Sequence, residues 1–267
     1  MRFWLSILLF LPLLHSSAQE TLESPYARTH STMFGFGYNN QLDTYLSPLE
    51  YTGTEIRFLQ ENIKGTSLLQ RNVSMQNLIQ ANFSYTKSPT DDGKYLSGMM
   101  DWNIALHYKW NLNFWKLYLG PQLGLHGGFI YNTRNGNNPA QARLAADLNI
   151  SGKAVYTFRL FHRPVDLRYQ ADILLAGLVF SPEYGQSYYE IFSLGHSGHN
   201  VCFTSPFSAL SANQLLTFDF PIKYAKLRLG VQNIVRQSHV YELKTHDWTW
   251  LFIVGYVKQF QLVKPHK

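Results

Sequence analysis

The sequence predicts an all-β fold: a transmembrane, antiparallel up-and-down β-barrel of about ten strands, within a range of roughly eight to twelve. Long stretches alternate apolar and polar residues. Aromatic residues make up 15% of the chain and charged residues only 15%, whereas a soluble domain carries about 25% charged residues. The mean hydropathy of −0.19 is slightly negative, so the apolar residues are interleaved with polar ones rather than gathered in membrane-spanning helices.

The N-terminal residues predict a cleaved signal peptide. Arg2 is a short basic region, residues 3–14 are largely apolar, and small residues precede a cleavage site after Ala18. The apolar run is too short to span a bilayer as a helix. We therefore expect a signal peptide over 1–18, a periplasmic segment over 19–30, the barrel over 31–260 and a C-terminal tail over 261–267.

The first three strands are expected over 31–39, 51–62 and 72–86. Successive side chains of a strand point to opposite faces. The acidic and basic residues of 51–62 would therefore share the inner face. In 72–86 the lipid-facing row would be Val73, Met75, Ile79, Ala81, Phe83 and Tyr85.

The next two strands, over 96–110 and 115–131, alternate most clearly. Asp101, His107 and Lys109 share one face of the first strand, and its other face is almost wholly apolar. Trp110 and Trp115 flank a tight turn at 111–113, where an interfacial aromatic girdle belongs. Pro121 removes a ladder donor in mid-strand, so we expect a β-bulge there.

Residues 140–160 and 165–180 determine which face meets lipid. An apolar row alternates with basic and acidic residues, among them Arg143, Asp147 and Lys153. A slip by one residue would put these charges in lipid, at about 2–4 kcal/mol for each basic residue near the midplane. The register is therefore strongly specified.

The last three strands are expected over 212–221, 224–236 and 247–260. Connections around 111–114, 161–164 and 221–224 are short, as in periplasmic turns, whereas those near 40–50, 87–95, 132–139, 181–211 and 237–246 are long, as in outer loops. We expect the outer membrane of a Gram-negative bacterium, with both termini periplasmic. A soluble β-sandwich is the rival fold, but sandwich strands are usually about 5–6 residues long.

The predicted inner rows carry both signs of charge. A ten-strand barrel is only slightly wider than the eight-strand type, whose interior is filled by side chains. Acids and bases in so narrow a lumen should pair, because an unpaired buried charge is costly. The sequence therefore predicts a polar network in the lumen that includes Glu55, Arg57, Asp101, Lys109, Arg143, Asp147, Arg168, Asp172 and Arg228.

Two stretches also carry a family resemblance. Residues 43–53 read DTYLSPLEYTG, and residues 187–192 read SYYEIF. Together with the signal peptide and the barrel pattern, they resemble an outer-membrane β-barrel family of unknown function from Bacteroides-type Gram-negative bacteria. The resemblance implies a location and a fold. It brings no activity, cofactor or functional residue.

The loop expected over 181–211 holds the remaining candidate chemistry. Its candidate ligand-binding residues are Tyr188, Tyr189, Glu190, His196 and His199. A lipid hydrolase would need a serine activated by a base, yet no serine here stands in a hydrolase motif. A metal site from Glu190, His196 and His199 would need fixed geometry, and we do not expect one. Packing of the tyrosines over the barrel mouth is the simpler interpretation.

The sequence favours a non-catalytic structural or accessory component of the outer membrane, with its outer loops as contact surface. A narrow solute channel and a lipid hydrolase using a Ser/His pair of the 181–211 loop are the alternatives. The expected partners are outer-membrane lipid and another outer-membrane protein. No two Lys or Arg residues are adjacent, so nucleic acid is not expected. No cofactor motif occurs, and Cys202 is the only cysteine, which rules out a disulfide framework.

Overall fold

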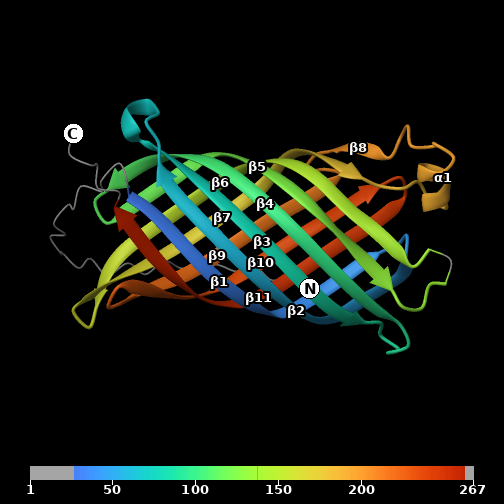
Figure 1. The fold of residues 1–267 in the computed structure, drawn as a ribbon, viewed down its shortest axis with the longest axis horizontal. Helices are drawn as coiled ribbons and strands as arrows, with labels where there is room; N and C mark the ends of the chain where they lie inside the picture. Colours follow the sequence, from blue (N-terminus) through green and yellow to red (C-terminus); the bar gives the residue numbers. More distant parts are fainter. Residues whose placement is uncertain (1–26, 137, 262–267) are drawn as a thin grey trace.

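The computed structural model describes residues 27–136 and 138–261 and confirms the predicted barrel (Figure 1). Ten long antiparallel strands and one strand of four residues, β8, form a single closed sheet in the described part of the chain. The strands are β1 (Ala27–Asp43), β2 (Ser47–Gly65), β3 (Val73–Lys87), β4 (Lys94–Leu112), β5 (Trp115–Asn132), β6 (Ala140–Leu160), β7 (Arg163–Phe180), β8 (Val201–Thr204), β9 (Ala209–Ile222), β10 (Ala225–Val240) and β11 (Leu243–Gln261). The expected signal peptide, over 1–18, lies outside the described residues, as do 262–267 of the expected tail.

The first and last strands pair along their whole length. The pairs run from Ala27 opposite Gln261 to Asp43 opposite Thr245. The described chain therefore starts and stops at one end of the barrel, here called the turn end, which also carries the two-residue turns 113–114, 161–162 and 223–224. The longer connection 66–72, with the 3₁₀ helix Leu69–Arg71, lies there too.

The opposite end, here called the loop end, carries the longer connections 88–93, 133–139 and 181–208. The last of these contains the short helix α1 (Tyr188–Phe192) and β8. The prediction of long loops at 40–50 and 237–246 is wrong, because the chain turns tightly at 44–46 and at 241–242. The strands on either side continue through polar residues such as Asn40 and Gln41, which pair across the sheet.

The β-bulge expected at Pro121 is also wrong. Pairing between β4 and β5 has the same register on both sides of this residue, and Pro121 lies opposite Ile150 of β6. A proline removes one donor, and here the ladder tolerates that loss without an inserted residue. The strand register shifts instead between Gln41 and Asp43, where β1 pairs with β2, and between Leu148 and Asn149, where β6 pairs with β7.

The outer surface of the barrel is apolar and aromatic, as predicted for a lipid-facing wall. Phe34, Phe36 and Leu123 are all exposed on it. Near the turn end, ring centroids are 4.8 Å apart for Trp115 and Tyr156 and 4.7 Å apart for Tyr108 and Trp110, as in an interfacial girdle. Across 27–136 and 138–261, no helix is both long and apolar enough to cross a membrane.

The depth of an outward residue should determine the cost of charging it. Leu123 lies midway along β5 and is 63% exposed, whereas Leu112 lies at a turn and is 54% exposed. Leu123→Arg should lower the free energy of unfolding in liposomes by about 2–4 kcal/mol, and Leu112→Arg by about 0–1 kcal/mol. Denaturant titration of tryptophan fluorescence measures both. Equal losses would show that one of these leucines does not lie at the depth assigned here.

Candidate functional site

The interior of the barrel is the candidate site, because the inward side chains gather there in successive layers. Two polar groups are separated by an apolar layer. On β2, Leu59 lies between Arg57 and Glu61 in the inner row, and on β3 Leu78 lies between Gln76 and Gln80. These alternations place one polar group toward each end of the barrel.

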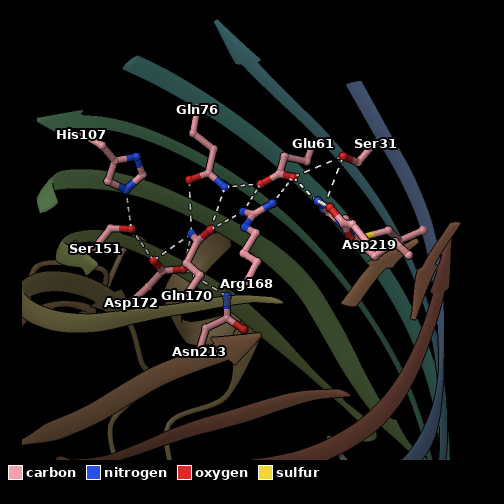
Figure 2. Close-up of polar contacts among 12 residues, drawn as sticks. Ser31, Glu61, Gln76, His107, Ser151, Arg168, Gln170, Asp172, Asn213 and Asp219 are labelled. Carbon is pink, nitrogen blue, oxygen red and sulfur yellow. Dashed lines mark hydrogen bonds and ion pairs between the residues drawn. The ribbon is translucent and has the colours of Figure 1, made fainter. Parts of the chain in front are cut away.

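The group nearer the turn end is centred on Glu61 (Figure 2). Its buried carboxylate accepts hydrogen bonds from Arg168 Nη1 at 2.6 Å and from Arg228 Nη1 at 3.0 Å. The Arg228 guanidinium also donates two hydrogen bonds of 2.7 Å to Asp219. We call these residues, with Gln76, Gln170 and Asp172, the Glu61 group. It joins β2 and β3 to β7, β9 and β10, which lie in the second half of the chain.

A histidine, a serine and an aspartate also meet beside this group. His107 Nε2 lies 2.8 Å from Ser151 Oγ, and Ser151 donates a 2.5 Å hydrogen bond to Asp172. In a hydrolytic triad the histidine lies between the nucleophile and the acid, whereas here the serine lies in the middle. His107 and Ser151 are fully buried, so the arrangement is that of a structural hydrogen-bond chain.

The apolar layer fills the lumen next to the Glu61 group. Its six residues are almost fully buried: Met33, Leu59, Leu78, Leu215, Leu251 and Ile253. Gly35 leaves room for them, because a Cβ at this position would lie 2.8 Å from Ile253 Cδ1. Closely packed apolar side chains leave little space for water at this level of the barrel.

The group nearer the loop end is centred on Asp101. This buried carboxylate accepts hydrogen bonds from Arg236 Nη2 at 2.8 Å and from His126 Nδ1 at 2.8 Å, and it lies 3.6 Å from Arg57 Nη1. Arg57 Nη2 in turn lies 2.7 Å from Glu55, and His126 Nε2 lies 3.2 Å from Asp147. We call these six residues the Asp101 group.

Amides connect the two groups through the apolar layer. Gln232 donates to Gln80 at 2.9 Å and to Asn213 at 2.8 Å. Asn213 then donates to Asp172 at 3.2 Å. Gln80 Oε1 accepts from Arg57 Nη1 of the Asp101 group at 3.4 Å. The polar side chains therefore form one continuous network from the Glu61 group to the Asp101 group.

Aromatic residues close the lumen at the loop end. The rings of Tyr51 and Tyr95 stack with centroids 3.6 Å apart and pack with Leu46 and Ile130. We call these four residues the mouth cluster. Beside it, Arg143 Nη1 donates to Asp43 at 3.1 Å. The cluster lies between the Asp101 group and the loops.

The structure places the predicted lumen residues as follows. Glu55, Arg57, Asp101 and Asp147 belong to the Asp101 group, Arg168, Asp172 and Arg228 belong to the Glu61 group, Arg143 lies near the mouth cluster, and Lys109 is half-buried near the turn end of β4. Sequence reasoning missed the apolar layer and the connecting glutamines. These residues occupy inward-facing positions in the alternating pattern of their strands, and this was the signal that could have identified them.

The candidate residues of the 181–208 loop have different environments in the structure. Glu190 caps α1: its carboxylate accepts hydrogen bonds from the Ser187 amide at 2.7 Å and hydroxyl at 2.9 Å, which hold the pKa of Glu190 below its usual value. The Tyr188 hydroxyl accepts from the Ala142 amide at 2.7 Å and donates to Gln141 at 3.0 Å. Tyr188 therefore attaches α1 to β6, in agreement with a packing role.

The other loop candidates are exposed. Tyr189, His196 and His199 all face solvent, and the two histidines border a shallow hollow of about 530 Å³ together with Glu190. Within the described residues, no three His, Cys, Asp or Glu side chains are grouped closely enough to hold a metal ion. Ser205 and Ser208 hydrogen-bond to each other, which gives them a turn-forming role.

Comparison with known proteins agrees with the fold. A family model described as protein of unknown function (DUF3316) matches residues 4–267, and no curated protein matches the chain in sequence. The crystal structure of the outer membrane protease OmpT from Escherichia coli is similar with a TM-score of 0.51 and 8% identity, over 90% of this chain and 99% of that chain. The translocator domain of the autotransporter NalP from Neisseria meningitidis has a TM-score of 0.43 and 10% identity, over 90% of each chain.

These similarities concern the fold. The expected resemblance to a family of unknown function is confirmed, and the likeness to OmpT shows that the chain shares the fold of an outer-membrane β-barrel. At such low identity, no residue role passes from OmpT to this chain.

Removing the shared acid of the Glu61 group should destabilise the barrel. Glu61→Gln keeps the side-chain shape but leaves Arg168 and Arg228 short of one buried negative charge, at a cost of about 3–5 kcal/mol. Denaturant unfolding of the refolded protein measures the loss. Asp92→Asn is the control, because it removes the partner of the exposed Arg134 and should change stability little. Similar stability of Glu61→Gln and wild type would contradict a stabilising role for this ion pair.

Proposed function

The chain belongs to the family of proteins of unknown function DUF3316, and we propose that it is a non-catalytic structural or accessory component of the outer membrane. In this proposal its lumen is closed and its loop end forms a contact surface. The observation that carries the proposal is the unbroken succession of side chains across the interior. The Glu61 group, the apolar layer, the Asp101 group and the mouth cluster follow one another along the barrel.

The space that remains inside supports closure. A chamber in the loop-end half, bordered by His126, Arg143 and Arg236, measures about 110 Å³. The chamber is large enough to hold water molecules. Below it, the apolar layer and the amides that cross it fill the lumen with side chains, which leaves no open path for hydrated ions. An open pore instead carries a wet lining with a bias in charge.

The loop end supports the contact surface. Tyr184, Tyr189 and Phe192 are exposed in the 181–208 loop, and Phe207 is fully exposed. Exposed apolar groups of this kind mark interaction sites on proteins. The loop is also held to the barrel, because the Tyr45 hydroxyl donates to the Gln186 carbonyl at 2.9 Å. We propose another outer-membrane protein as the partner of this surface.

We further propose that the turn end faces the periplasm, with both termini on that side. The pairing of Ala27 with Gln261 puts both ends of the barrel strands there. Short periplasmic turns and longer outer loops are the rule in barrels of this class. Three two-residue turns at the turn end and the 181–208 connection at the loop end follow this rule, whereas the 66–72 connection and the tight turns at 44–46 and 241–242 do not.

Purified wild-type protein should show no steady conductance in a planar bilayer. The apolar layer and the charge-paired groups leave no continuous wet path through the barrel. Single-channel recording measures this directly, with an open porin in the same bilayer as the positive control. A stable current that depends on salt concentration would reject the closed lumen and support a narrow solute channel instead.

Epitope tags should reveal the orientation. A tag inserted after Gly198, in the 181–208 loop, should bind antibody on intact cells. A tag inserted after Gln70, in the 66–72 connection, should bind only after the outer membrane is permeabilised. Both positions are exposed, so folding should tolerate either insertion. Reversed accessibility would overturn the proposed orientation.

A further inference from the structure

The lipid-facing wall has a groove that the closed lumen does not explain. Two hollows, of about 600 and 510 Å³, lie side by side over β4 to β8 in the loop-end half of the barrel. They form one continuous groove because they share four lining residues: Trp102, Leu125, Ala146 and Leu178. Each hollow lies within the range of about 300–1,000 Å³ that is typical of small-molecule sites.

Small residues make the floor of this groove. Gly127 lies in the outward row of β5, between Met100 of β4 and Leu144 of β6. A Cβ added at Gly127 would be 3.7 Å from its nearest neighbour, Leu144 Cδ2, so the backbone leaves free space outside it. Ala146 lines both hollows and deepens the floor toward the middle of the barrel.

Large apolar side chains make the walls. On one side, Trp102 is fixed by a 3.0 Å hydrogen bond from its Nε1 to Asn77 Oδ1. The same bond gives the amide of Asn77, on the lipid-facing wall, a hydrogen-bond partner. On the other side, β8 returns along β7 and presents Val201 and Phe203, which are 67% and 70% exposed. The 181–208 loop therefore adds a wall to the barrel surface, in addition to covering its end.

The lining determines the kind of occupant. The polar residues that border the groove, His126 and Asp147, point inward and interact at 3.2 Å, so the groove itself is apolar. It follows the strands across a surface that already faces lipid, and it lies in the half of the barrel nearer the loops. A long, flexible hydrocarbon chain matches this shape and this environment.

We propose that the groove is a specific site for one acyl chain of lipopolysaccharide, the acylated glycolipid of the outer leaflet. The choice of leaflet rests on the orientation proposed above, whereas the groove itself does not. A chain held there would lie against Trp102 and Phe203, with its headgroup beside the 181–208 loop. The site goes beyond the general lipid contact that every such barrel makes, because the floor and walls are shaped for a single chain.

Filling the floor should abolish retention of the lipid. Gly127→Trp places a large side chain in the groove, and Gly152→Trp is the matched control. Gly152 is an outward glycine on β6 whose added Cβ would also have its nearest neighbour at 3.7 Å, and it lies outside the groove. The delipidated proteins are incubated with lipopolysaccharide or with phosphatidylethanolamine in mild detergent, and native mass spectrometry counts the bound lipid.

Wild type and Gly152→Trp should retain one lipopolysaccharide. Gly127→Trp should retain at least about tenfold less, since losing the burial of only two methylene groups costs about that factor. If Gly127→Trp fails to fold by circular dichroism, Ala146→Leu fills the same floor. Equal retention by the filled variant and its control would overturn the site. Preference for phosphatidylethanolamine would overturn the lipid assignment and leave the closed lumen untouched, because conductance is measured separately.

Discussion

Charge pairing inside a narrow closed barrel is the constraint on which the rest of this structure depends. Ten strands in lipid leave an interior too narrow to keep charged side chains fully hydrated, so a buried charge needs a partner of opposite sign. Glu61 shows the consequence. It accepts from Arg168 of β7 and Arg228 of β10, so one carboxylate links three strands across the lumen. Strands that are distant in sequence are thereby held at a fixed distance, and the apolar layer can pack between the two polar groups.

The strands and their facing could be predicted because one face of each strand meets lipid. The alternation around Arg143 and Asp147 allows a single register, since any slip would put charge in hydrocarbon. The partners inside the barrel could not be predicted in the same way. Which base meets Glu61 depends on how far neighbouring strands are staggered around the closed sheet, and alternation within a strand carries no information on stagger. The apolar layer was missed because it is formed by five strands, each of which contributes only one or two of its residues, such as Leu59 or Leu78.

The loop connections show a second limit of pattern reasoning. Polar residues such as Asn40 and Gln41 look like loop residues, yet they continue a strand past the lipid, where the outer face no longer needs to be apolar. The loop candidates show a related effect. Glu190 is of a residue type that often binds ligands, but its carboxylate accepts hydrogen bonds from the Ser187 amide and hydroxyl. Helix capping and catalysis use the same types of side chain. The two roles are distinguished only by where the hydrogen-bond donors to the carboxylate lie in the folded protein.

The two surfaces of the barrel wall have opposite requirements, and this places the binding feature on the outside. Inside the barrel, a gap would leave a charged side chain without its partner or would admit water. Gly35, which has no side chain, lets the apolar layer pack tightly there. Outside, a gap costs little, because lipid chains are flexible and fill it. A glycine such as Gly127 can therefore leave a hollow in the wall without loss of stability, provided that the inner row behind it remains paired. His126 and Asp147 satisfy that condition directly behind the groove. The charge-paired lumen thus allows the lipid-facing wall to be shaped for a particular chain.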